Sequence, residues 1–174
     1  MWDGLYDHME HMIMGLAAEL IADRYEITRA EQMLMRGDYS DALGKLEAIR
    51  PTISRESASH QQLHLMLGFG YLLTCRWQEL VEVDQHILSG PSRHLANISQ
   101  THARLAAAYH YLGDRSESDR RIYQAEFSAS QIRNDFDRVD ALRSLATAYL
   151  LCGNEEKARR TATTGVGISL RHAI

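Results

Sequence analysis

The sequence predicts an all-α solenoid, a fold in which similar helical hairpins stack in a row. Apolar residues recur every three or four positions along the 174 residues, which is typical of amphipathic helices, and no convincing alternation marks a strand. A short pattern also occurs four times: a small residue, an aromatic or long apolar residue three positions later, and a turn. The turn residues Gly37, Cys75, Gly113 and Gly153 lie 38, 38 and 40 residues apart. A fixed period of this size is the signature of stacked helical repeats.

Each copy of the pattern predicts a first helix, a turn and a second helix. The small residue lets the second helix approach closely, and the larger one fills the space beside it one turn along the same face. These pairs are Ala30 and Met33, Gly68 and Tyr71, Ala106 and Tyr109, and Ala146 and Tyr149. Glycine suits the turn because the residue after a helix commonly adopts a left-handed conformation, so the copy with Cys75 is expected to have the poorest turn.

The second helix of each copy has its own signals. Ala42, Leu80, Ser118 and Ala158 are expected to face the first helix. The two prolines, Pro51 and Pro91, each follow a second helix and are expected to end it, because proline cannot continue a helix.

The pattern resembles the tetratricopeptide repeat family, which has a small residue, an aromatic residue, glycine, alanine and proline at set positions. The resemblance covers roughly residues 23–170 and is strongest in LAAAYHYLGDRSES, from Leu105, and LATAYLLCGNEEKA, from Leu145. The period of 38–40 exceeds the family's 34 residues, as in kinesin light chains and the helical sensor domains of some large bacterial transcription activators. The family's conserved first-helix tryptophan is absent.

The resemblance implies a protein-binding groove on the concave face, lined by the first helices. An apolar floor with two arginines suits an extended or helical peptide that carries apolar anchors and acidic groups. Alternatively, several of these residues are buried between repeats. The groove positions are Gln62, Leu65, Met66, Phe69, Leu72, Leu73, Gln100, Arg104, Ala107, His110, Tyr111, Arg143, Thr147 and Leu150.

Residues 1–22 predict a separate helix before the solenoid, which we place at residues 23–174 within a single domain overall. This helix carries an apolar stripe and is rich in carboxylates. Two interpretations are open: it caps the solenoid or packs in its core, or it is a dimerisation helix in which methionines supply adaptable contacts. The candidate oligomerisation residues are Trp2, Leu5, Tyr6, Met9, Met12 and Ile13.

Composition narrows the class of function. The net charge of −4 argues against nucleic-acid binding. No apolar run approaches the roughly 20 residues of a membrane span, and the acidic N-terminus does not resemble a secretory signal. Cys75 and Cys152 fall two repeats apart, too far to bridge, and two free thiols indicate a reducing cytoplasm. Seventeen arginines against two lysines suggest a GC-rich bacterial genome.

Histidines supply the only hint of a metal site. Glu56, His60 and His64 are spaced to share one helix face, and His8 and His11 flank Glu10. No HExxH motif or phosphate-binding loop accompanies them, so we expect surface histidines, no metal, no cofactor and no catalytic residues.

The sequence therefore predicts a cytoplasmic protein-binding adaptor or an assembly or secretion chaperone, with an unidentified protein or peptide partner and no nucleic-acid or membrane partner. The alternatives are a regulatory sensor that binds a small molecule or signalling peptide, and a helical metalloenzyme.

Overall fold

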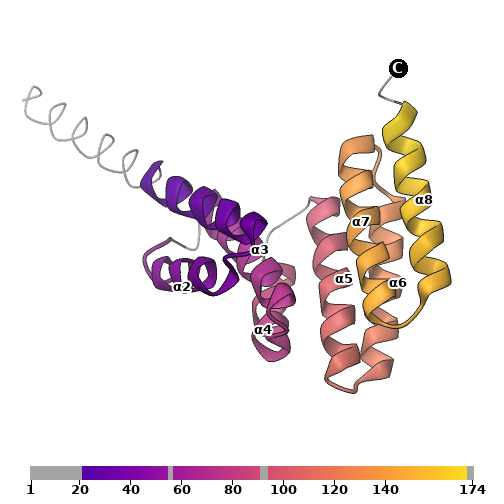
Figure 1. The fold of residues 1–174 in the computed structure, drawn as a ribbon, viewed down its shortest axis with the longest axis horizontal. Helices are drawn as coiled ribbons and strands as arrows, with labels where there is room; N and C mark the ends of the chain where they lie inside the picture. The colour runs from indigo at the N-terminus through magenta and orange to yellow at the C-terminus, as the bar shows by residue number, and fades with distance from the viewer. Residues whose placement is uncertain (1–20, 55–56, 91–93, 172–174) are drawn as a thin grey trace, which may run out of the picture. The chain divides into compact units, whose positions relative to one another are not determined.

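The computed structural model describes residues 21–54, 57–90 and 94–171, and these ranges contain helices and turns but no strand. Residues 21–36 are helical, and seven further helices follow (Figure 1). They are α2 (Tyr39–Ile49), α3 (Ala58–Leu73), α4 (Trp77–Ser89), α5 (Leu95–Tyr111), α6 (Arg115–Ser130), α7 (Asp135–Leu151) and α8 (Glu155–Arg171). The predicted fold class, an all-α solenoid of helical hairpins, is confirmed.

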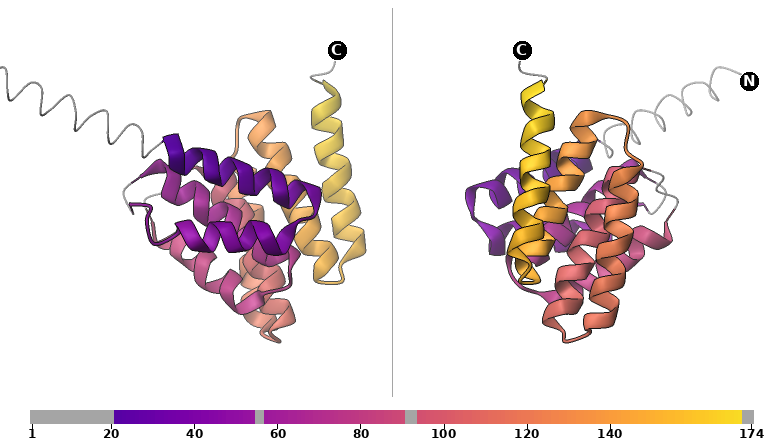
Figure 2. Two further views of the ribbon diagram at one scale, coloured as in Figure 1. Left: turned by 60° about the vertical axis from the view of Figure 1, so that its left-hand side comes forward. Right: turned by 90° about the vertical axis from the view of Figure 1, so that its right-hand side faces the viewer.

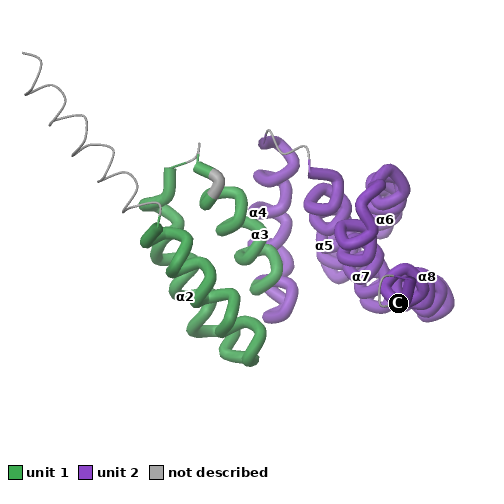
Figure 3. Tube along the Cα trace, turned by 90° about the horizontal axis from the view of Figure 1, so that it is seen from above, with its two compact units in different colours: residues 1–70 green, residues 71–174 purple. Residues whose placement is uncertain are grey.

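The chain forms two compact units, residues 1–70 and 71–174, shown in different colours in Figure 3. The predicted boundary between a first helix and the solenoid, near residue 22, stays a prediction because residues 1–20 lie outside the described ranges.

In the first unit, close packing depends on a small residue at the end of α3. A Cβ atom on Gly70 would lie 2.6 Å from Leu43 Cδ2 of α2 and 3.4 Å from Leu34 Cδ2. The absent side chain therefore lets the helices approach closely. Ala42 is fully buried, as its predicted place on the second helix requires, and so is Ala30 of the first helix.

In the second unit, α4 packs on α5, the α5–α6 hairpin packs on α7, and α7 pairs with α8 (Figures 1 and 2). The core between the two hairpins combines small residues with a few large ones. Small residues from α5 and α6, such as Ala103 and Ala125, pack with Leu145 and Tyr149 of α7. The small side chains allow the helices to approach closely, and the large ones fill the space beside them.

The second-helix positions predicted to face the first helix are buried in this unit too. Leu80, Ser118 and Ala158 are all at most 8% exposed. Ser118 Oγ donates a hydrogen bond to the Ala106 carbonyl at 2.8 Å, which ties α6 to α5 at the point where both residues are small.

The four predicted turns share one hydrogen-bond pattern. The residue after each turn position donates its N–H to the carbonyl of the large residue that recurs in every repeat: Asp38 to Met33, Arg76 to Tyr71, Asp114 to Tyr109 and Asn154 to Tyr149. This is the bond of a Schellman motif, which requires a left-handed residue at the turn. The left-handed residues are Gly37, Cys75, Gly113 and Gly153, with φ of 94°, 56°, 87° and 78°.

We predict that Cys75→Gly stabilises the protein by about 0.5–1 kcal/mol. A left-handed non-glycine residue costs roughly 1–2 kcal/mol, of which glycine's larger unfolded-state entropy cancels a part. Cys75 is exposed and forms no disulfide, so its side chain has little packing to lose. The measurement is urea unfolding of the parent and the variant.

Gly113→Ala is the matched control for this prediction. A Cβ atom on Gly113 would meet nothing within 4 Å, so alanine there adds only the backbone penalty. It should lower stability by about 1 kcal/mol. If the two substitutions shift the unfolding midpoint in the same direction, the backbone explanation is wrong.

Candidate functional site

The predicted groove residues differ in how far they reach the surface. In α3, Gln62, Leu65, Met66, Phe69, Leu72 and Leu73 are all half-buried. In α5, Gln100 and His110 are half-buried and Tyr111 is exposed, whereas Arg104 and Ala107 are buried. In α7, Arg143, Thr147 and Leu150 are all exposed. Burial between repeats, the alternative left open by the sequence, therefore describes Ala107.

Arg104 is bound by a carboxylate inside the second unit. Its Nε and one terminal nitrogen donate to the two oxygens of Asp84 on α4 at 2.9 and 2.7 Å. The Asp84 side chain is 0% exposed and that of Arg104 is 8% exposed. Burial raises the pKa of the Asp84 carboxyl, and the adjacent Arg104 guanidinium opposes that rise. Because this two-point pairing occupies the guanidinium, we leave Arg104 out of the candidate site.

An apolar groove of about 680 Å³ lies between α7 and α8. The α7 wall includes three exposed residues that the sequence predicted to face a groove, Arg143, Thr147 and Leu150. The α8 wall is small or aliphatic. Arg143 and Arg159 stand in the lining together with one carboxylate, Glu155. The α8 lining residues are Glu155, Ala158, Arg159, Ala162, Gly165, Val166, Ser169 and Leu170.

The α8 wall was not predicted, because the resemblance assigns the groove to the first helix of each repeat. Two glycines inside one helix, Gly165 and Gly167, were the available signal. A glycine in a helix interior costs about 1 kcal/mol relative to alanine, so its presence calls for a packing reason. Gly165 is buried and lines the groove, and a Cβ atom there would lie 3.8 Å from Leu142 Cβ of α7, which is an ordinary contact distance.

The repeat register shows what kind of surface the groove is. Gly113 and Gly153 are equivalent, so residues 40 positions apart occupy corresponding places in the last two repeats. In the third repeat, Ala103, Ile122 and Ala125 pack against α7. Their equivalents in the fourth repeat, Arg143, Ala162 and Gly165, all line the groove. The groove is therefore the counterpart of the surface on which the α5–α6 hairpin holds α7.

Exposure along α7 supports this assignment. Ala96, Ala103 and Ala107 of α5 are buried, while their equivalents Phe136, Arg143 and Thr147 on α7 are exposed. Phe136, on the same face, is 78% exposed. The face that one helix covers on α5 is thus uncovered on α7 among the described residues.

A second, polar pocket of about 370 Å³ lies where the turns of the last two hairpins meet. Its lining includes His110, Arg115, Cys152 and Lys157. Burial raises the pKa of the Cys152 thiol, which disfavours the reactive thiolate. Ser118 Oγ, also in the lining, already donates to the Ala106 carbonyl. These groups supply no activated nucleophile.

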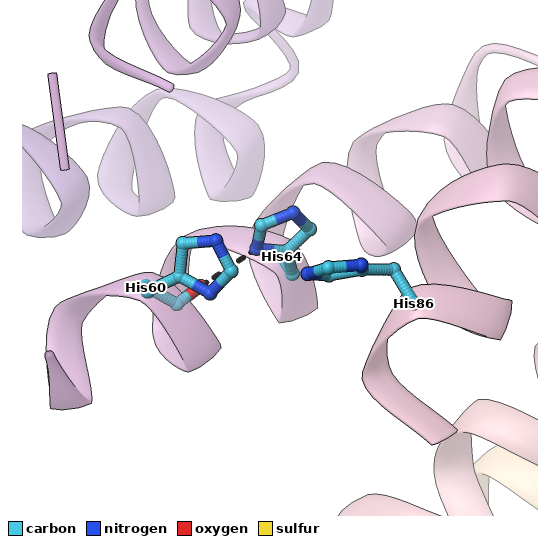
Figure 4. Close-up of side chains that lie close together, drawn as sticks. All are labelled: His60, His64 and His86. Carbon is cyan, nitrogen blue, oxygen red and sulfur yellow. Dashed lines mark hydrogen bonds between the residues drawn. The ribbon is translucent and has the colours of Figure 1, made fainter. Parts of the chain in front are cut away.

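The predicted histidine pair is present on α3. Figure 4 shows His60 and His64 one turn apart, with ring centroids separated by 4.1 Å and His64 Nδ1 2.8 Å from the His60 carbonyl oxygen. That nitrogen is therefore occupied by a backbone contact. Glu56, the predicted third member, lies outside the described residues. His86, also labelled in Figure 4, belongs to α4 of the second unit, and we assign no site that spans the two units.

The predicted oligomerisation residues, Trp2, Leu5, Tyr6, Met9, Met12 and Ile13, lie outside the described residues, as do His8 and His11. In the described part of the chain, no helix combines the length and apolar character needed to cross a membrane.

Comparison with known proteins gives one structural likeness. No family model matches the sequence, and no curated protein matches it. A solved structure of a putative kinesin light chain from Podospora anserina, with nearly identical TPR-like repeats, is similar over 86% of this chain and 95% of its own. Its sequence identity to this chain is 18% and the TM-score is 0.36. The helical hairpins and the shared turns of this chain show a fold of repeated, TPR-like helical hairpins.

Proposed function

We propose that this chain is a cytoplasmic adaptor or assembly chaperone that holds an amphipathic helix of a partner protein in the α7–α8 groove. The single observation that carries the proposal is the register equivalence between this groove and the surface that holds α7. The α7–α8 groove consists of residues equivalent to those with which the α5–α6 hairpin binds α7, so the groove is suited to bind another helix.

The lining indicates the chemistry of the partner helix. Leu150, Val166 and Leu170 are each about 60% exposed, at 59%, 58% and 62%, and offer apolar contacts to side chains spaced along one helix face. The small residues of α8 leave room for large anchors opposite them. Arg159 forms no ion pair with another described residue, and Arg143 is held only by an exposed contact to Asp140 at 3.2 Å. Both guanidiniums can meet carboxylates that flank the apolar face of a partner.

A site-specific cross-linking experiment tests this proposal. A photoreactive phenylalanine analogue is placed at Val166 in the groove and, in a control chain, at Tyr123, which is 67% exposed on α6 and does not line the groove. Irradiation in host cells should give a defined covalent product from position 166 and not from position 123, with the partner identified by mass spectrometry.

Two results would contradict the proposal. Identical products from both positions would indicate non-specific contact, and a specific product from position 123 alone would place the binding surface elsewhere. Adducts between two copies of the chain are recognised by their mass, twice 19.8 kDa.

A further inference from the structure

The α7–α8 groove lacks a covering helix among the described residues, and the chain itself contains a segment with the right pattern. We propose that residues 1–20 of a second copy bind in this groove, so that two copies form a dimer by exchanging these segments. The proposal rests on the proposed function only in that the groove must accept an amphipathic helix.

The apolar residues of segment 1–20 have the same spacing as the buried face of α7. The face by which α7 packs into its own site consists of Ala141, Leu145, Ala148 and Tyr149, at positions i, i+4, i+7 and i+8. The sequence of residues 1–20 contains apolar residues at the same spacing. They are Leu5, Met9, Met12 and Ile13. In a helix these four side chains share one face.

The side chains of the α8 wall are smaller than their equivalents in the preceding repeat. On the α8 wall, Ala162 replaces Ile122 of the preceding repeat and Gly165 replaces Ala125, so this wall is cut back relative to the site that holds α7. An occupant needs larger side chains to fill it. The segment has methionines at the positions equivalent to Leu145 and Ala148, and methionine adapts to irregular space.

The segment and the groove carry opposite charge. Residues 1–20 contain four carboxylates, Asp3, Asp7, Glu10 and Glu19, and no lysine or arginine. The groove lining contains Arg143 and Arg159 against the single carboxylate of Glu155. The segment and the groove therefore attract each other, which favours correct encounter.

We assign the segment to a second copy because a symmetric dimer satisfies both members of the contact. Each copy offers one segment and one groove, so two copies satisfy both by a reciprocal exchange. A partner helix of the proposed function must then displace the segment.

The test measures the mass of the whole chain in solution by light scattering and sedimentation over a range of concentrations. The parent should be a dimer of twice 19.8 kDa. Met9→Gln with Met12→Gln, a change in the segment, and Leu150→Gln with Val166→Gln, a change in the groove, should each raise the dimer dissociation constant at least a hundredfold. Tyr123→Gln, an exposed residue outside the groove, should leave it unchanged. Circular dichroism checks that each variant keeps its helix content.

A mixture of the two double variants separates exchange from other modes of association. The segment variant still has an intact groove, and the groove variant still has an intact segment, so one contact can form between them. The mixture should give a heterodimer at concentrations where each variant alone is a monomer. A labelled peptide of residues 1–20 should likewise bind the segment variant and not a chain that carries both pairs of changes.

Three outcomes overturn the proposal. A monomeric parent that binds no peptide shows that the groove does not take this segment. A monomeric parent whose segment variant gains peptide binding shows that the segment covers the groove of its own chain. A dimer that survives the groove changes shows that the contact is elsewhere. If cross-linking from position 166 still captures a different protein in any of these cases, the proposed function stands without this inference.

Discussion

Replacing Arg104 with methionine should destabilise the protein by about 3–5 kcal/mol. The change removes one member of a buried ion pair and leaves the Asp84 carboxylate, which is 0% exposed, without its two charge-assisted hydrogen bonds. An uncompensated buried charge is among the most costly defects in a protein interior. Urea unfolding followed by circular dichroism measures the loss.

The double variant Asp84→Leu with Arg104→Met is the decisive control. Replacing both members with apolar residues of similar size removes the unpaired charge, so most of the lost stability should return, because a buried ion pair itself contributes little net free energy. If Arg104 instead served a partner from an exposed groove, Arg104→Met would lower partner binding and leave the unfolding midpoint within about 0.5 kcal/mol of the parent. That result would contradict the structural role assigned to the pair.

The ion pair between Asp84 and Arg104 could not be predicted from the sequence. The repeat register placed Arg104 on the side of α5 where a groove was expected. An arginine at such a position is typical of a residue that binds an acidic group of a partner. The countercharge, Asp84, lies 20 residues earlier on a different helix, with no local signal that the two side chains meet. Pairing across helices depends on how hairpins stack, which a single sequence does not specify.

Features set by local backbone chemistry were predicted well. Gly37, Gly113 and Gly153 adopt the left-handed conformation. Cys75 adopts it too, although this conformation is unfavourable for a residue with a Cβ atom. A hairpin turn is determined by a few adjacent residues, so its pattern survives in the sequence. The small positions opposite the turns, such as Ala106 and Ser118, are likewise buried as predicted.

The α7–α8 groove differs from the concave groove that the repeat pattern predicted along the first helices, and that predicted groove stays a prediction. Arg143, Thr147 and Leu150, which were assigned to the predicted groove, line the α7–α8 groove, whose other wall comes from α8. In the third repeat the equivalent face of α5 is covered: Ala103 and Ala107 are both buried, and Ala103 packs with residues of α7. Equivalent positions thus differ in exposure according to whether another helix covers them, and this depends on neighbours in space rather than on the residue itself.

Two leucines on α7 allow that distinction to be measured within one helix. Leu145 is 4% exposed in the core between the hairpins, and Leu150 is 59% exposed in the groove lining. Leu145→Ala should cost about 2–5 kcal/mol, because it removes buried apolar surface and leaves a cavity among residues that are already small. Leu150→Ala should change the stability of the isolated unit by less than about 0.5 kcal/mol.

The two substitutions should separate again in a binding assay, because the groove assigns Leu150 to contact with another helix. Leu150→Ala should lower cross-linking of a partner helix from position 166 and raise the dissociation constant of the dimer. Its unfolding midpoint in denaturant should stay nearly unchanged when measured at concentrations where the chain is monomeric. Leu145→Ala should weaken binding only to the extent that it unfolds the chain. If Leu150→Ala lowers stability as strongly as Leu145→Ala in monomeric protein, then Leu150 is packed within its own chain. The groove would then be closed from inside rather than open to a second helix.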